Sequence, residues 1–362
     1  MMHHKDLYKK GVDIGVQQQL RQQQLLNEQR QRRLNSQDES RHLEALTTEP
    51  EQGEEQQQQQ QLPKARKQQN KNQKGQQHFR LQQSEWLRQR PKNLSDWLLV
   101  PCPSGKRCLV VAANGRTKVY NKAGRQIMQI RTLLPGDGHV QKCKTVLDCV
   151  YVPDLNCFYV LDALTFGQQQ LLECEASFRF YWLQARFEEH PELTERSKRN
   201  EKAFQLLNYY DFENAPVVEE ALQRYPLWLE DKPRLDGLLF YHKDASYTCG
   251  TTPLVCWLFA FMLPDVLGMP INAGYEAPED YDGAAALAYM DEFDRKLLEQ
   301  RKLMKMRAKA AKTAATEEVY NEMDVADPEG DEDFESLQIL LDHDRRLELG
   351  ELDMECEVAA TC

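Results

Sequence analysis

The chain has 362 residues, ten cysteines and a formal net charge of −11 at pH 7. No apolar stretch is long enough to span a bilayer, and the polar N-terminus is unlike a signal peptide, so we expect an intracellular protein without a membrane partner. The cysteines include no Cys-x-x-Cys pair and no Cys/His cluster, which argues against a zinc site or a disulfide framework. We therefore predict reduced thiols, no metal and no cofactor.

The N-terminal zone, residues 1–80, is predicted to be a mostly disordered arm. It is poor in aromatic residues and crowded with glutamine, including the run from Gln56 to Gln61, so it cannot bury enough apolar surface to offset its ordering entropy. Residues 63–80 add six Lys or Arg and no acid, which makes the arm partly basic. Within it, residues 12–34 are rich in Leu, Gln and Arg, which favours a transient helix that folds on a partner.

The middle zone, residues 81–282, carries all five tryptophans and a pattern of short apolar strands separated by turn signals. The strands are expected at 97–100, 108–113, 118–121, 126–131, 147–152, 158–163, 178–185 and 237–242. A helix is expected at 216–224 and a buried segment at 252–267. This pattern predicts an α+β fold built mainly on an antiparallel β-sheet domain.

The C-terminal zone divides into two parts. Residues 283–316 are rich in Ala, Leu, Lys, Arg and Met, which predicts a long helix. Residues 317–362 hold seventeen acids and two arginines, so we expect an acidic, disordered tail. An acidic interaction scaffold, with this tail as the functional part, is therefore one alternative for the function of the chain.

One short motif in the sheet domain carries chemistry. Residues 102–107, Cys-Pro-Ser-Gly-Lys-Arg, resemble the nucleotide-attachment motif Lys-x-Asp-Gly-x-Arg of guanylyltransferases and ligases, in which the lysine amine attacks the nucleotide α-phosphate. Cys102 replaces that lysine and Ser104 replaces the aspartate, whereas Gly105 and Arg107 remain. We expect a guanosine pocket without transferase chemistry, and an active guanylyltransferase is the alternative.

Three carboxylates and one lysine bear on the enzyme alternative. Active nucleotidyltransferases use carboxylates of their later motifs to hold a metal, and Asp148, Asp162 and Asp236 lie in or beside predicted strands. A carboxylate at a strand end is more often a turn cap, however, and here no lysine nucleophile accompanies it. Lys106 is four residues from the nucleophile position and should point elsewhere. We therefore predict that the chain is not an enzyme.

Several longer sequence words identify a family. They lie at 84–87 (Ser-Glu-Trp-Leu), 102–112, 133–136 (Leu-Leu-Pro-Gly), 178–182, 235–243 and 252–258. In type and order they resemble the snurportins, which are import adaptors that recognise the trimethylguanosine cap of spliceosomal small nuclear ribonucleoproteins (snRNPs). The resemblance implies a cap domain similar in fold to guanylyltransferases and other nucleotidyltransferases. It also implies a non-enzymatic role in the nuclear import of snRNPs, with shuttling between cytoplasm and nucleus.

The resemblance further implies a cap-binding site. Trp257 matches a tryptophan that stacks on the cap base, and Trp86 matches one that lies near the extra methyl groups. Ser84 matches a residue that helps to read the guanine edge, while Arg107 and Lys122 are expected to bind the cap phosphates. The predicted cap-binding set is Ser84, Trp86, Cys102, Gly105, Lys106, Arg107, Lys122, Trp257 and Leu258. Without the resemblance, a tryptophan in such a domain is more often core and a lone Lys or Arg more often a solvated charge.

The expected partners follow from the same resemblance. They are the trimethylguanosine-capped small nuclear RNA and its snRNP, a nuclear import receptor, and the exportin that recycles snurportins. Snurportins usually carry a basic helix that binds importin β, but here residues 19–34 offer only four arginines among glutamines, namely Arg21, Arg30, Arg32 and Arg33. The sequence therefore leaves open whether importin β or another importin binds the arm.

Overall fold

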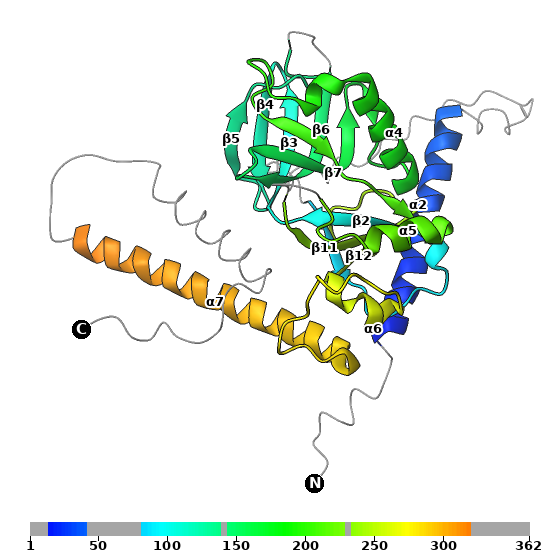
Figure 1. Cartoon of the computed structure of the whole chain (residues 1–362). Coiled ribbons are helices and arrows are strands. Elements are labelled where there is room, and N and C mark those ends of the chain that lie inside the picture. The colour runs from blue at the N-terminus through cyan, green and yellow to red at the C-terminus, as the bar shows by residue number, and fades with distance from the viewer. Residues whose placement is uncertain (1–13, 42–80, 139–142, 229–232, 320–362) are drawn as a thin grey trace, which may run out of the picture.

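The computed structural model describes residues 14–41, 81–138, 143–228 and 233–319, and two β-sheets form the body of this part of the chain (Figure 1). The five-stranded sheet has the order β1 (Gln82–Trp86), β12 (Gly250–Leu258), β11 (Leu235–His242), β2 (Trp97–Pro103) and β10 (Tyr210–Asp211). The seven-stranded sheet has the order β5 (Gln126–Ile130), β4 (Arg116–Asn121), β3 (Lys106–Ala113), β6 (Lys144–Val152), β7 (Cys157–Phe166) and β8 (Gln169–Gln170), with β9 (Ala203–Leu206) also paired to β7. Among these pairs only β1 with β12 and β7 with β9 are parallel, which confirms the predicted, mainly antiparallel α+β fold.

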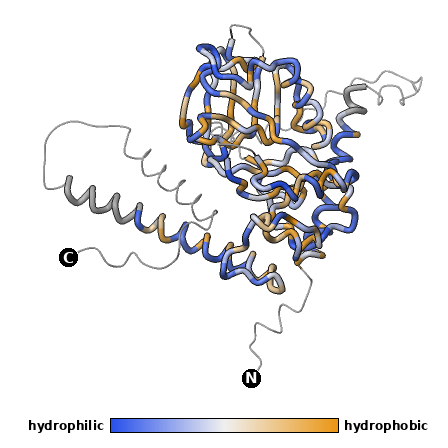
Figure 2. Tube along the Cα trace, viewed as in Figure 1, coloured by the Kyte–Doolittle hydropathy of each residue, from blue (hydrophilic) through white to orange (hydrophobic). Residues whose placement is uncertain are grey.

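Strand β2 shows how the two sheets pack together. Its sequence Trp-Leu-Leu-Val-Pro-Cys-Pro is buried at every position. Leu98 and Val100 belong to an apolar cluster shared with β6 and β7, whereas Trp97 and Leu99 belong to a cluster on the opposite face that includes helices α5 (Ala215–Leu222) and α6 (Leu263–Leu267). A strand that is buried on both faces requires a continuous apolar run. Figure 2 shows such hydrophobic stretches along the strands of both sheets.

One predicted strand is wrong. The segment 178–185 lies inside helix α4 (Ala176–Glu189), which covers the seven-stranded sheet. Its aromatic residues favoured a strand, but its buried positions recur at the three- and four-residue spacing of a helix face. These positions are Ala176, Arg179, Phe180, Leu183 and Phe187. The other predicted strands are present, and the segment 252–267 divides into β12 and α6.

Helix α2 (Ile14–Arg41) lies in the arm that was predicted to be mostly disordered, and it runs alongside the body (Figure 1). The helix is mostly hydrophilic, and the side chains that it buries are glutamines, Gln18, Gln22 and Gln29. Gln29, for example, accepts a 2.9 Å hydrogen bond from the backbone N–H of Ser246. Hydrogen bonds to the sheet domain thus hold a helix that begins within the segment 12–34, where the sequence predicts a transient helix. The rest of the arm lies outside the described residues.

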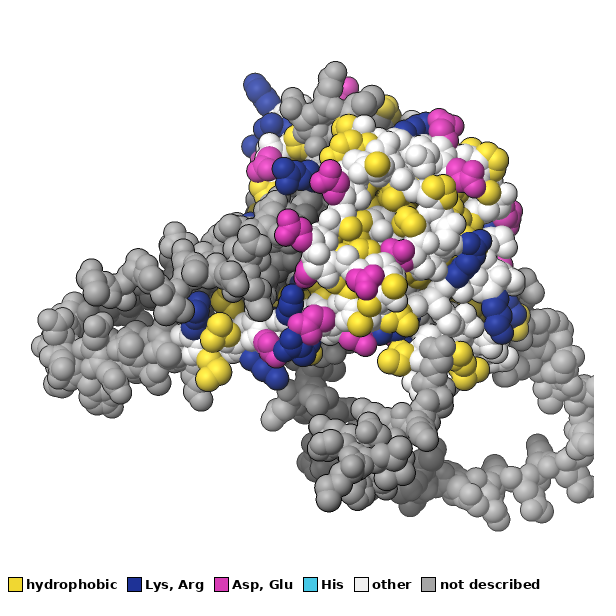
Figure 3. Space-filling view, turned by 60° about the horizontal axis from the view of Figure 1, so that its bottom comes forward, with side chains coloured by type: hydrophobic (Ala, Val, Ile, Leu, Met, Phe, Trp, Pro, Cys, Tyr) yellow, Lys and Arg dark blue, Asp and Glu magenta, His cyan; other side chains and the backbone are white. Residues whose placement is uncertain are grey.

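Helix α7 (Ala286–Val319) occupies most of the range 283–316, where a helix is predicted. Its first turns pack on the five-stranded sheet through Ala286 and Met290, and beyond them the helix leaves the body (Figure 1). On the face shown in Figure 3, acidic and basic side chains are interspersed with apolar ones. In the described ranges, none of the helices is both long and apolar enough to cross a membrane. The acidic tail predicted at 317–362 lies almost entirely outside these ranges.

Candidate functional site

A cavity of about 520 Å³ lies where one edge of the five-stranded sheet meets the turn from β2 to β3. Seven of the nine residues predicted to bind the cap line it: Ser84, Trp86, Cys102, Gly105, Arg107, Lys122 and Trp257. The other two, Lys106 and Leu258, do not line it. Strand alternation explains both exceptions. Lys106 lies between Gly105 and Arg107, which line the cavity. Leu258 follows Trp257 and is fully buried in the core.

The register between β1 and β12 brings the two predicted tryptophans together. These strands are parallel, and Trp86 pairs with Trp257. The backbone N–H of Leu87 donates a 3.0 Å hydrogen bond to the carbonyl of Trp257, which continues the ladder past the pair. Residues that pair across neighbouring strands project to the same face of the sheet, so both indole rings reach the same cavity.

The register contains one irregularity, next to Ser84. Ser84 pairs with Thr252 of β12, but the next residue, Glu85, pairs with Cys256. Three β12 residues, 253–255, therefore have no partner on β1. The Pro253 carbonyl in this skipped stretch accepts a 2.9 Å hydrogen bond from Gln22 of α2. The irregularity lets Ser84, Glu85 and Trp86 all line the cavity although strand alternation would remove the middle one.

The absence of a side chain at Gly237 of β11 allows the Trp257 ring to pack directly against the β11 backbone. A Cβ atom at position 237 would lie 2.2 Å from Cζ2 of Trp257, so the indole rests directly on the glycine backbone. No side chain larger than hydrogen leaves room for the ring in this position. Gly237 lies within the family-like segment 235–243, but nothing in the local sequence predicts this contact.

The Trp86 ring is held by residues that the sequence reasoning missed. Its Nε1 donates a 2.9 Å hydrogen bond to Oδ1 of Asp294 on α7. Phe259 and Phe293 contact the ring at centroid distances of 5.6 and 5.5 Å, the latter edge-on. All three residues line the cavity. Two of them are about 200 positions from Trp86 in the chain, and no local motif connects them to it.

The degenerate motif contributes another part of the cavity wall. Gly105 approaches β6 so closely that an added Cβ would lie 2.6 Å from Cγ1 of Val150 and 2.7 Å from the Tyr151 carbonyl oxygen. The retained glycine is therefore required by packing. Cys102, at the position of the attacking lysine, lines the cavity and is buried, with only 7% of its surface exposed.

Arg107 is part of the protein framework. Its Nε and Nη2 donate hydrogen bonds of 2.9 and 2.7 Å to the two carboxylate oxygens of Asp148, which also accepts a 2.7 Å hydrogen bond from the Tyr247 hydroxyl. Burial opposes the charge on the guanidinium, but the field of Asp148 and these hydrogen bonds raise the pKa of Arg107 well above its usual value. Only Nη1 lies outside this pair, which limits the phosphate contact expected from the sequence.

The carboxylates that suggested a metal have different roles. The Asp148 carboxylate is paired with Arg107. The Asp162 carboxylate is buried and accepts hydrogen bonds of 2.8 and 2.7 Å from Nε and Nη2 of Arg179. Asp236 does line the cavity. Within the described residues, His, Cys, Asp and Glu side chains form no group of three that could hold a metal ion. The two buried carboxylates thus serve as partners of buried arginines.

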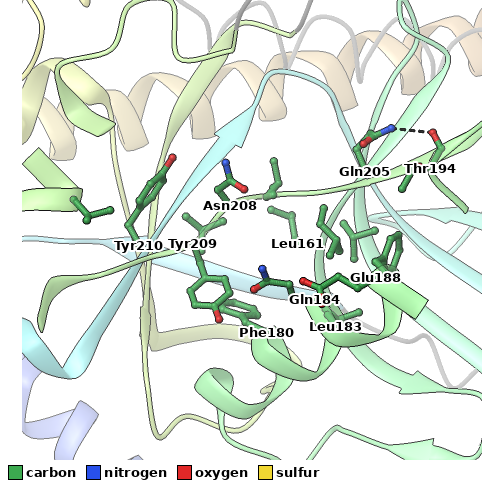
Figure 4. Close-up of a pocket in the computed structure, with 16 residues that line it drawn as sticks. Leu161, Phe180, Leu183, Gln184, Glu188, Thr194, Gln205, Asn208, Tyr209 and Tyr210 are labelled. Carbon is green, nitrogen blue, oxygen red and sulfur yellow. Dashed lines mark hydrogen bonds between the residues drawn. The ribbon is translucent and has the colours of Figure 1, made fainter. Parts of the chain in front are cut away.

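A second cavity, of about 620 Å³, contains none of the predicted residues. It lies between α4 and the segment that leads from β9 to β10, and its walls include Phe180, Leu183 and Tyr209 (Figure 4). At one end Gln205 Nε2 donates a 3.0 Å hydrogen bond to the Thr194 carbonyl. Its walls are largely apolar and lack a charged pair, so the first cavity is the better candidate for a charged ligand.

Comparison with known families assigns the domain that contains the first cavity. Residues 80–260, half of the chain, match the sequence model of the family described as the Snurportin1 m3G cap-binding domain. The chain belongs to the snurportin family. This confirms the resemblance drawn from the sequence words, and in this snurportin the matched range includes both site tryptophans and the degenerate motif.

Solved structures similar to this snurportin include DNA ligases. The ligase domain of LigD from M. tuberculosis aligns at 14% identity with a TM-score of 0.32, covering 49% of this chain and 57% of that one. A mycobacterial DNA ligase D complexed with ATP and MES aligns at 12% identity with a TM-score of 0.33, covering 49% of this chain and 59% of that one. The Chlorella virus DNA ligase-adenylate aligns at 12% identity with a TM-score of 0.31, covering 50% of this chain and 67% of that one. The snurportin chain thus spans less than two thirds of the two ligase D chains.

The close contact at Gly237 yields a prediction. In Gly237→Ala the new methyl displaces the Trp257 indole, so the affinity for a trimethylguanosine cap analogue should fall by about 1–3 kcal/mol, the value of a base–aromatic stack. Tryptophan fluorescence titration measures this loss, and thermal melting reports the fold. Gly138→Ala is the matched control, because no heavy atom lies within 4 Å of its added Cβ. Unchanged cap affinity in Gly237→Ala would show that the ring position is irrelevant to binding.

Proposed function

We propose that this snurportin is a non-enzymatic adaptor that binds the trimethylguanosine cap of spliceosomal snRNPs and promotes their nuclear import. The observation that carries the proposal is the pairing of Trp86 with Trp257 in one cavity, inside a domain of the m3G cap-binding family. The RNA-binding part of the proposal rests on this cavity. The import part rests on the family resemblance.

The cavity suits the chemistry of the cap base. A guanine methylated at N7 carries a delocalised positive charge, which an indole face attracts by stacking and by cation–π interaction. Trp257, supported from below by Gly237, offers a face of this kind. The Trp86 ring is enclosed by Phe259 and Phe293, and an apolar aromatic wall favours methyl groups where an unmethylated amine prefers water.

The cap phosphates require positive charge at the mouth of the cavity. Lys122 lines the cavity, is exposed and lies in the turn between β4 and β5. The Lys122 ammonium is exposed, whereas the Arg107 guanidinium is held by the buried carboxylate of Asp148, so Lys122 is the more accessible of the two for a phosphate. The contact should be sensitive to salt, as phosphate contacts generally are.

The two tryptophans should have separable effects. Trp257→Ala removes the stacking platform, so it should weaken binding of the trimethylated cap by about 1–3 kcal/mol. Trp86→Ala should chiefly reduce the preference for trimethylated over monomethylated caps. Titration of the full chain with both cap analogues measures the two effects, and Trp97→Phe in the core is the control. Equal binding of both analogues by the wild-type chain would instead favour the acidic-scaffold alternative.

The absence of enzymatic activity can be tested directly. Cys102 stands where guanylyltransferases have the lysine that forms the adduct, and a thiol there cannot form the phosphoamide bond. Wild-type protein incubated with labelled GTP and magnesium should therefore retain no covalent label after denaturation. Cys102→Lys should also remain unlabelled, because Ser104 replaces the motif aspartate and Asp148 and Asp162 are held by arginines. Covalent label on either protein would establish guanylyltransferase activity.

Import requires a receptor, and we propose that the arm binds an importin and that a recycling exportin returns the adaptor to the cytoplasm. Arg21, Arg30 and Arg33 of α2 form ion pairs with Glu85, Asp244 and Glu175 of the sheet domain, at 2.6, 3.5 and 3.2 Å respectively. Binding of importin β through these arginines would have to replace the internal pairs. This favours weak binding of importin β or the use of another import receptor.

A pull-down with purified receptors tests this choice. We expect importin β to be captured weakly and to be released at moderate salt, because surface charge pairs contribute only about 0–1 kcal/mol each. A second importin should be retained under the same conditions, and its capture should depend on residues 1–80. Tight, salt-resistant capture of importin β would contradict this expectation. Full import by a chain that lacks residues 1–80 would place the signal in the sheet domain or the acidic tail.

A further inference from the structure

The cavity has walls that come from outside the family-matched range. Ile14 and Arg21 of α2 and Phe293 and Asp294 of α7 all line it, whereas the family match covers only residues 80–260. The matched domain supplies the tryptophans and the motif. Helices on both flanks complete the enclosure in this chain.

The position of α7 against the cavity is fixed by packing. Met290 is fully buried in the core, and Asp291 forms a 2.7 Å ion pair with Arg88, which follows β1. One turn further on, Phe293 packs edge-on against Trp86, with an interplanar angle of 87°. Residues three and four positions apart share a helix face, so Met290 carries Phe293 and Asp294 to the same side. The Asp294 carboxylate is therefore placed by the core.

The Asp294 carboxylate has an unusual environment among the charges of the cavity. Its Oδ1 accepts a hydrogen bond from the Trp86 indole, and the residue is partly buried. Glu85, in the same cavity, is neutralised by Arg21 at 2.6 Å. In the described part of the chain, no Lys or Arg forms an ion pair with Asp294. The wall beside Trp86 thus carries a carboxylate whose hydrogen-bond donor, the Trp86 indole, is neutral.

We propose that Asp294 is a specificity-determining residue that selects a positively charged, N7-methylated base. The inference rests on the proposed cap-binding function and deepens it. A carboxylate in a partly enclosed cavity attracts a cation more strongly than it would in bulk water, and a neutral guanine lacks this charge–charge attraction. Trp257 can stack on either base, and its cation–π attraction already gives some preference for the cationic one. Asp294 adds a full negative charge to that preference.

The test uses the full chain and two dinucleotide cap analogues that differ only at N7. One carries methyl groups at N7 and twice at N2, and the other carries only the two N2 methyls, so their bases are cationic and neutral respectively. The key variant is Asp294→Asn. It keeps the shape of the side chain and an oxygen that can accept the Trp86 hydrogen bond, while it removes the negative charge and replaces the other oxygen by an amide NH2.

We expect Asp294→Asn to weaken binding of the cationic analogue by about tenfold while binding of the neutral analogue stays unchanged. The matched control is Glu292→Gln, which removes one negative charge from the same helix, where Glu292 pairs with Arg295 outside the cavity. The control should keep the wild-type ratio of the two affinities. The proposal is overturned if Asp294→Asn also keeps that ratio, or if it weakens both analogues equally. Failure of the wild-type chain to bind either analogue would overturn the proposed function itself.

Discussion

The parallel pairing of β1 with β12 determines the geometry of the cavity. β1 is an edge strand of five residues, and its register places Trp86 beside Trp257. A slip of one residue would send Trp86 to the opposite face and replace it with a neighbour. The pairing is secured at its end by the hydrogen bond from Leu87 to the Trp257 carbonyl, and Leu87 itself is buried in the core. The site therefore depends on a short strand fixed by one buried leucine.

The residues of the degenerate motif that match the nucleotide-attachment pattern serve the fold of this chain. Gly105 is required for the close approach to Val150, and Arg107 neutralises the buried Asp148. Removing one partner of a buried ion pair leaves an uncompensated charge, which costs about 3–5 kcal/mol. The two positions that differ from the motif, Cys102 and Ser104, are those at which nucleotidyltransferases have the lysine and the aspartate. The residues that match the motif thus have structural roles in this chain that do not depend on catalysis.

The sequence predicts the parts of the structure that depend on local pattern. Alternating or continuous apolar runs located β2 to β7, and the sequence words located Ser84, Trp86 and Trp257. Helix α4 was missed because its aromatic residues masked a helical spacing. Asp294 and Phe293 could not be found, because their approach to Trp86 depends on how α7 packs through Met290. Contacts between segments about 200 residues apart are set by tertiary packing, which no local pattern encodes.

The two flanking helices are attached to the cavity by different forces. Met290 and Ala286 anchor α7 by apolar burial, and burying a side chain such as Met contributes about 1.5–3 kcal/mol. Helix α2 is held by glutamine hydrogen bonds, which contribute about 0.5–1.5 kcal/mol each, and by exposed arginine ion pairs, which contribute about 0–1 kcal/mol each because water competes for them. The Asp294 wall thus rests on apolar burial, whereas the wall formed by Ile14 and Arg21 belongs to a helix held by polar contacts, the ionic part of which salt weakens.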